Sequence, residues 1–314
     1  MTQAPTPTAD TVRRLVRSLL ADGGKADAGP GVRPVTDDGG HRTWWVGTRH
    51  VLRLAPDREA AARQRRELRL RDLVRPHIPV PVPVSVAHGE WPDDGLTYTL
   101  DARLPGGSAE EQAVSAVGEA DLAGLLTGLR EVPVRQAETL GVPREAPRSL
   151  ETLRAAAGEA ARDLAAADEF DPARLARFPA PAAAQLGAQS GAAVLVNHGL
   201  RGEHLVVSGD GRVRGVLGWT GAVVGDPAED IAGLAVAVGA PAAVRAATLA
   251  GYGARPCLRG LWLARCDTVV RLAGRLRGPG EGSLPLLRTR LRRAWEPILL
   301  ERVSDLGGGA DEGS

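Results

Sequence analysis

Residues 194–232 read VLVNHGLRGEHLVVSGDGRVRGVLGWTGAVVGDPAEDIA, and this stretch decides the fold. Its apolar runs are short and bounded by turn residues. They predict strands at Ala193–Val196, Leu205–Val207 and Val213–Leu217, the last two joined by the turn SGDGR. The segment GDP at 225–227 is typical of a helix start, with an aspartate as N-cap and a proline at the first helical position. A polar loop between strands is therefore expected just ahead of a helix.

The first third of the chain has the pattern of a small sheet domain. Thr11–Ala21 places its apolar residues on one face of a helix, and the glycine-punctuated segments after it predict three antiparallel strands that end near Leu54. Arg58–Val74 reads as a charged helix, and the proline-rich run beyond it must be extended. A further strand is expected at Leu96–Leu100. The composition then changes, so we expect residues 1–104 to form one domain.

Residues 105–306 are expected to form a second, mainly helical domain. Long helices are predicted at Glu110–Val132, Ser149–Ala166 and Asp171–Ser190, and helices resume after the strands described above. The glycine-rich tail, 307–314, is predicted to be disordered. The predicted fold class is α+β, with an antiparallel sheet and one charged helix followed by a helical lobe.

Composition and charge argue against several classes of partner and site. The formal net charge of the 314 residues is +1, which gives no reason to expect nucleic acid or an anionic membrane as a partner. Only Cys257 and Cys266 are present, without a histidine cluster, which argues against a disulfide framework or a zinc site. No signal peptide or long apolar run occurs, so a cytoplasmic protein is expected. Lys25 is the one lysine, and any role that usually belongs to lysine must fall to arginine.

A sheet domain with one charged helix, then a helical domain that holds a strand pair and a polar loop, is the order found in protein-kinase-like small-molecule kinases. On the residues quoted above, the chain resembles the aminoglycoside phosphotransferase family, including its macrolide-modifying relatives. The resemblance runs from about residue 11 to about residue 300 and is most specific over Val194–Ala232. It implies a bilobal kinase-like fold.

In that family the catalytic loop reads roughly V-H-G-D-L-x-x-x-N/H. The aspartate orients and deprotonates the acceptor hydroxyl, and the last residue holds magnesium. Setting the segment from Leu200 onward on this pattern places His204 at the metal-side position and Gly199 at the position of the base aspartate. Asn197 and His198 then take the places of the family's histidine and glycine.

The family's I-D-W motif, whose aspartate holds magnesium on the nucleotide phosphates, matches 217–219, and Gly218 stands in place of that aspartate. The motif G-D-P-A-x-D-L-A is intact, and the resemblance gives its Asp230 the role of supporting the catalytic loop. A glycine supplies neither a base nor a metal ligand, so the two replacements indicate abandoned phosphoryl transfer. His198 as a substitute base, and Glu203 or His204 as a weak metal ligand, are the alternatives.

On the nucleotide side, Arg53 stands where kinases place a phosphate-binding lysine, and Glu67 stands where the ion-pair partner of that lysine belongs. An arginine fork can hold phosphate oxygens, although among so many arginines a surface role is equally open. Gly40 falls in the phosphate-covering loop, and Leu100 and Ala102 fall in the hinge that bonds adenine. The implied cofactor is ATP or another nucleotide, with magnesium bound weakly or not at all.

The acidic lining that holds polycationic aminoglycosides in the family is not located by the sequence, and Glu110, Glu111 and Asp121 are expected to form a solvated helix face. Three functions stay open. The first is a pseudokinase that binds or scaffolds a small molecule, a peptide or a partner protein. The second is an atypical active ATP-dependent small-molecule O-phosphotransferase, and the third is a repurposed cleft in a peptide- or antibiotic-tailoring pathway. The two glycines favour the first.

Overall fold

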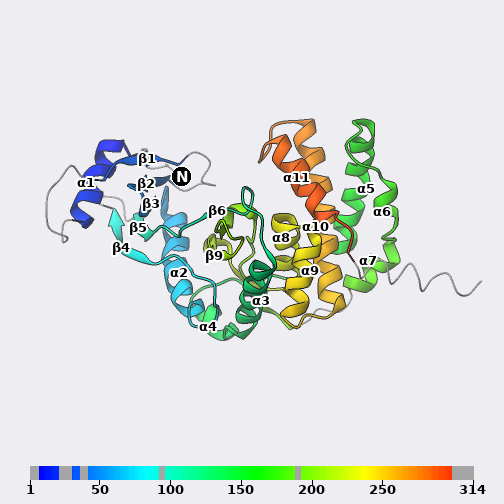
Figure 1. Cartoon of the computed structure of the whole chain (residues 1–314), viewed down its shortest axis with the longest axis horizontal. Helices are drawn as coiled ribbons and strands as arrows, with labels where there is room; N and C mark the ends of the chain where they lie inside the picture. The colour runs from blue at the N-terminus through cyan, green and yellow to red at the C-terminus, as the bar shows by residue number, and fades with distance from the viewer. Residues whose placement is uncertain (1–6, 21–29, 36–41, 92–95, 188–191, 299–314) are drawn as a thin grey trace, which may run out of the picture.

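The computed structural model describes residues 7–20, 30–35, 42–91, 96–187 and 192–298. Its N-terminal part is built on one antiparallel sheet, at the left of Figure 1, with the strand order β1-β2-β3-β5-β4. The strands are β1 (Val32–Pro34), β2 (Arg42–Val46), β3 (His50–Leu54), β4 (Ser85–Trp91) and β5 (Leu96–Ala102). The expected three antiparallel strands ending at Leu54 are confirmed, and two more strands complete the sheet.

Two helices flank this sheet. Helix α1 (Ala9–Leu20) buries Val12 and Val16 in one cluster with Leu52 and Leu100 of the sheet. Because side chains alternate along a strand, Arg53 points away from that cluster. Helix α2 (Arg58–Val74) has the predicted limits, since the side chain of Asp57 accepts a hydrogen bond from the Ala60 amide at its start.

The second lobe is mainly helical and lies to the right in Figure 1. Its longest helix, α10, contacts α5, α8 and α11, and all four contribute to one large apolar core. The helices of this lobe are α3 (Ala116–Glu131), α4 (Val134–Thr139), α5 (Leu150–Ala166), α6 (Ala173–Ala176), α7 (Ala180–Gly187), α8 (Ala228–Val238), α9 (Ala240–Leu249), α10 (Ala254–Arg277) and α11 (Leu284–Ala294). No helix within the described ranges is long and apolar enough to cross a membrane.

Short strands flank the loops of residues 194–232. They form a three-stranded sheet, β6-β8-β9, and a pair, β10-β7. The predicted hairpin is present, with strand β9 ending one residue earlier than expected. The strands are β6 (Gly107–Ser108), β7 (Val194–Val196), β8 (Leu205–Val207), β9 (Val213–Val216) and β10 (Val223–Gly225).

Two predicted helices differ from the structure. The helix expected from Glu110 begins at Ala116, because the Ser115 hydroxyl accepts the Gly118 amide and starts the helix there. The helix expected over 171–190 is broken into α6 and α7, with a proline at 179 between them. The tail predicted to be disordered, 307–314, lies outside the described residues.

Candidate functional site

The polar loop after β7 is bound by a side chain of helix α8. Asp230, 2% exposed, accepts hydrogen bonds from the backbone amides of Asn197 (2.9 Å) and His198 (3.0 Å). One carboxylate thus satisfies two buried donors with its two oxygens. The supporting contact that the resemblance implies for Asp230 is therefore present in the structure.

The imidazole of His204 fills the space between the two replacement glycines. Its Nδ1 lies 2.5 Å from the carbonyl oxygen of Gly199, and because a carbonyl only accepts, Nδ1 carries the hydrogen. A Cβ built on Gly218 would lie 2.5 Å from the same Nδ1 and 2.7 Å from Cε1 of the ring. A Cβ built on Gly199 would lie 3.2 Å from it. The ring therefore stands where a side chain at Gly218 would begin, and it would be in tight contact with one at Gly199.

The backbones of these two loops are also tied together. The Leu217 amide donates to the carbonyl of His204 at 2.8 Å, and the side-chain amide of Asn197 donates to the Leu217 carbonyl at 3.4 Å. Gly218 has φ of +74°, in the left-handed region, and it caps the short 3₁₀ turn at Trp219–Gly221. The loops keep a definite geometry although both carboxylates are missing.

The residues present do not fit magnesium. This ion needs several hard oxygen ligands in near-ideal octahedral geometry. Here Nδ1 of His204 carries a hydrogen, and the carboxylate of Glu203 accepts a hydrogen bond from Arg290 at 2.6 Å. Within the part of the chain that the structure describes, no three His, Cys, Asp or Glu side chains gather at a common point.

His198, the candidate substitute base, is displayed at the surface of the loop. It has φ of +59°, a conformation that a glycine adopts at no steric cost, which accounts for the glycine of the family pattern at this position. Its Nε2 lies 3.9 Å from the Glu145 carboxylate. Together with Gly199, it lines a cavity of about 290 Å³ beside helices α8 and α10.

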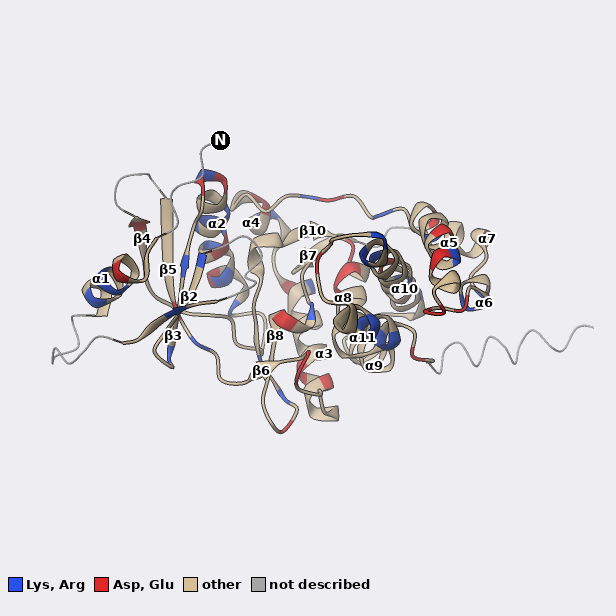
Figure 2. Ribbon diagram, turned by 90° about the horizontal axis from the view of Figure 1, so that it is seen from above, with Lys and Arg blue, Asp and Glu red and all other residues tan. Residues whose placement is uncertain are grey.

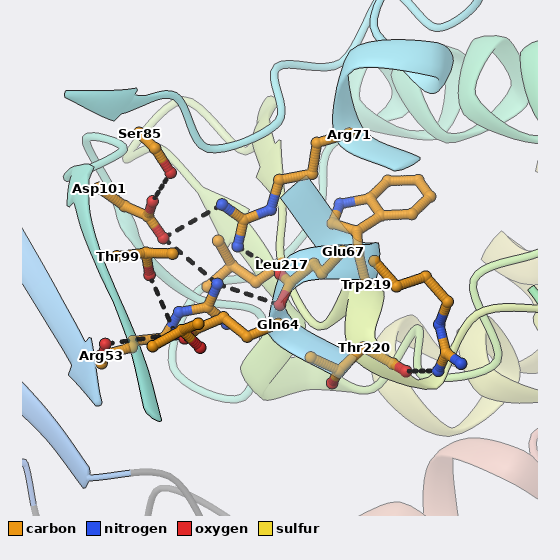
Figure 3. Close-up of polar contacts among 12 residues, drawn as sticks. Arg53, Gln64, Glu67, Arg71, Ser85, Thr99, Asp101, Leu217, Trp219 and Thr220 are labelled. Atoms are coloured by element: carbon orange, nitrogen blue, oxygen red, sulfur yellow. Dashed lines mark hydrogen bonds and ion pairs between the residues drawn. The ribbon is translucent and has the colours of Figure 1, made fainter. Parts of the chain in front are cut away.

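In the sheet domain, Arg53 belongs to a buried cluster of four charges (Figure 3). Its guanidinium lies 3.1 Å from the carboxylate of Glu67 and 3.4 Å from that of Asp101. A second arginine, Arg71, donates to Asp101 at 3.1 Å and also to Glu67. Two cations and two anions therefore share one site, which we call the N-lobe charge cluster.

Burial and the neighbouring opposite charges act against each other on the pKa values of Glu67 and Arg53. Burial would raise the pKa of Glu67, but Arg53 and Arg71 outweigh it and lower the pKa to about 2. Burial would likewise lower the pKa of Arg53, and the carboxylates of Glu67 and Asp101 outweigh it and raise that pKa. Glu67 and Arg53 therefore stay charged at neutral pH, and Arg53 is already engaged by two carboxylates.

The predicted pairing of Arg53 with Glu67 is thus present, and Arg71 and Asp101, which were not predicted from the sequence, join it. Arg71 follows Glu67 by four residues on a helix, a spacing that places the two side chains on one face and could have been noticed. Asp101 gave no local signal, since only the sheet brings it to α2.

The predicted hinge residues lie within strand β5. Leu100 is fully buried in the core of the sheet domain. The amide of Ala102 donates to the Val84 carbonyl, and the amide of Arg103 donates to the Arg49 carbonyl, each at 2.8 Å. These two donors are therefore used within the protein. Gly40 lies outside the described residues.

The expectation of a solvated acidic face at the start of the helical lobe is wrong for two of its three residues. Glu110 accepts hydrogen bonds from Arg290 and Arg293, and Asp121 accepts from the side chain of Arg212. Only Glu111 is exposed. Ion pairs with residues distant in the chain hold Glu110 and Asp121 in partly buried positions.

The model of a family described as phosphotransferase enzymes matches residues 31–261. No curated protein sequence matches the chain. Among solved structures, the GDP complex of wild-type aminoglycoside 2'-phosphotransferase-IIIa is 16% identical, with a TM-score of 0.66 over 92% of this chain and 98% of that one. A macrolide 2'-phosphotransferase from Brachybacterium faecium, as apoenzyme, is 22% identical, with a TM-score of 0.56 over 90% and 98%. An aminoglycoside phosphotransferase in a ternary complex with streptomycin and ATP is 11% identical, with a TM-score of 0.55 over 94% and 98%.

Proposed function

We propose that this chain, which belongs to the phosphotransferase enzyme family, is a pseudokinase: a binding protein on the kinase-like fold with little or no phosphoryl transfer. The observation that carries the proposal is the position of His204. Its ring occupies the place where a side chain at Gly218 would begin and lies in tight contact with the place where one at Gly199 would begin.

The chemistry of the family explains why this matters. Phosphoryl transfer depends on positioning and on cancelling negative charge, chiefly through magnesium and a carboxylate that orients the nucleophile. Loss of a general base alone costs roughly 100- to 10,000-fold in rate. Loss of the metal ligand removes a separate contribution. With both absent, we expect turnover far below that of ordinary kinases.

Nucleotide binding is the part of the family function that this chain is proposed to keep in weakened form. Solved relatives hold GDP or ATP. In this chain Arg53 would have to exchange part of its contact with Glu67 and Asp101 for a phosphate, which lowers the gain from binding. We therefore expect ATP or another nucleotide to bind weakly, and we expect magnesium not to raise its affinity.

One observation favours an active enzyme as the second candidate. His198 is next to the missing base and lines the cavity, where an imidazole could accept a proton. The test is ADP release from ATP and magnesium, measured for the parent protein and for His198→Gln. The proposal expects a rate at least about 1,000-fold below the ordinary range of roughly 1–100 per second, equal in both proteins. An ordinary rate that falls in His198→Gln would overturn it in favour of the second candidate.

Calorimetry completes the test. ATP is titrated into the protein with and without magnesium, and the proposal expects the same weak affinity in both. Tight binding that requires magnesium would show that a metal ligand exists, and it would contradict the assignment of His204 as a space-filling residue.

A further inference from the structure

The cavity beside the catalytic loop has a lining that differs in charge from the one the resemblance implies. It lies among the loop, α8, α10 and α11 and has a volume of about 290 Å³. Its charged side chains are four arginines and two carboxylates: Arg148, Arg201, Arg271, Arg290, Glu229 and Asp267. In Figure 2 the basic segments of α10 and α11 lie beside the acidic first turn of α8. The family's acidic lining is replaced by a basic one.

Both carboxylates in this lining are already used by one arginine. Arg148 donates to the two oxygens of Glu229 at 2.7 and 2.8 Å, and to the two oxygens of Asp267 at 2.8 and 3.0 Å. Its backbone is held as well, because Arg259 donates to its carbonyl at 2.7 Å. Bidentate arginine–carboxylate pairs are among the stronger ion pairs in proteins. An ammonium group of a ligand would therefore compete with Arg148 for both carboxylates.

The remaining arginines differ in how far their charge is compensated. Arg290 is largely buried and donates to Glu110 at 2.8 Å and to Glu203 at 2.6 Å. Arg201 is 3.9 Å from the same Glu203, and its side chain is 40% exposed. Arg271 is exposed and makes no hydrogen bond or ion pair with the residues that the structure describes. The positive charge at the cavity is therefore least compensated at Arg271, which has no partner among the described residues, and at Arg201, whose one ion pair is long and half exposed.

We propose that this cavity binds a small organic anion, carrying a carboxylate or a phosphate group, and that Arg201 and Arg271 recognise the anionic group. Both arginines present planar, multiply donating guanidinium groups to a cavity in whose lining arginines outnumber carboxylates. Leu200, Val236 and Leu287 add an apolar wall for the rest of the ligand. The volume is at the lower end of the range for small-molecule pockets, roughly 300–1,000 Å³.

The inference deepens the proposed function and rests on it, because it names the class of ligand for the cleft of a protein that binds rather than phosphorylates. It also excludes a polycationic aminoglycoside as that ligand. The absence of a base carboxylate at Gly199 removes the negative charge that would otherwise repel an anion from this part of the cleft.

The test is calorimetry on the full chain with three probes: inorganic phosphate, citrate and the polycation kanamycin. We expect phosphate or citrate to bind and kanamycin not to bind, and the preferred anion distinguishes a phosphate ligand from a carboxylate ligand. Arg201→Gln and Arg271→Gln should each weaken the anion about tenfold or more, since each removes a charge-assisted hydrogen bond. Arg69→Gln is the matched control, an exposed arginine on α2 far from the cavity, and should bind like the parent.

Three outcomes would overturn the inference: binding of kanamycin in preference to both anions, no binding of either anion, or anion binding that neither cavity variant weakens. ADP release is measured on the same samples and reports separately on the proposed function. Rapid turnover with intact anion binding contradicts only the pseudokinase assignment. Absence of both turnover and anion binding contradicts only the ligand class.

Discussion

The ring of His204 stands against the backbone of Gly218, so closely that a Cβ on this glycine would lie 2.5 Å from Nδ1. Non-bonded atoms do not approach that closely, and the ring would have to move before any side chain could be placed there. His204 and Gly218 are therefore coupled. A carboxylate at 218 and an imidazole in its present position exclude each other.

The first prediction concerns restoration of the metal site. Gly199→Asp with Gly218→Asp should by itself restore little magnesium-dependent ATP binding, because His204 blocks the second carboxylate. Aspartate tolerates left-handed φ, so the backbone at 218 is a small obstacle compared with the ring. Adding His204→Asn, the other residue of the family pattern, should restore magnesium-dependent binding. Metal titration in the presence of ATP checks this, and equal restoration by the double and the triple variant would disprove the coupling.

The second prediction concerns the N-lobe charge cluster. Arg71→Ala removes one of two cations from a site where Glu67 is fully buried, so the free energy of unfolding should fall by about 3 kcal/mol or more. Arg75→Ala is the matched control, because its partner Asp72 is exposed and such pairs contribute little. Urea denaturation of the three proteins gives the comparison. Equal stability of both variants would show that the cluster does not stabilise the fold.

The third prediction is the pH dependence of stability. The pKa of Glu67 is lowered in the folded state to about 2, so its contribution is complete above its ordinary value of 4.5 and is lost as pH falls from there through 2. On acidification from about pH 5 to about pH 3, the parent should lose on the order of 2 kcal/mol more than Glu67→Gln. Urea denaturation at a series of pH values measures this difference, and parallel curves for the two proteins would contradict it.

The fourth prediction concerns the support of the loop. Asp230→Ala leaves the amides of Asn197 and His198 without their acceptor, and each unsatisfied buried donor costs about 1–3 kcal/mol. Hydrogen exchange at these two amides should become much faster while exchange in α10 stays slow. Asp230→Asn, which keeps one acceptor oxygen, should show an intermediate effect. Unchanged exchange in Asp230→Ala would mean that the loop is held by other contacts.

Much of the fold could be predicted from local patterns. Apolar periodicity and turn residues located the sheet of the first lobe, and the limits of Arg58–Val74 followed from an N-cap aspartate at one end and a proline beyond the other. The order of motifs then identified the kinase-like fold, which the likeness to a solved aminoglycoside phosphotransferase confirms. The prediction of one continuous helix over 171–190 was wrong, because prolines interrupt a run that is otherwise rich in alanine.

What the sequence by itself determined is therefore the identity of the fold and the absence of carboxylates at Gly199 and Gly218. These depend on residue type and on order along the chain. Only the tertiary structure decided what fills that space and which charges meet. Arg148 and Asp267 are 119 positions apart in the chain, and Arg290 and Glu110 are 180 apart, yet each pair is in hydrogen-bond contact. Periodicity carries no information about such contacts, because they arise only when segments far apart in the chain pack against one another.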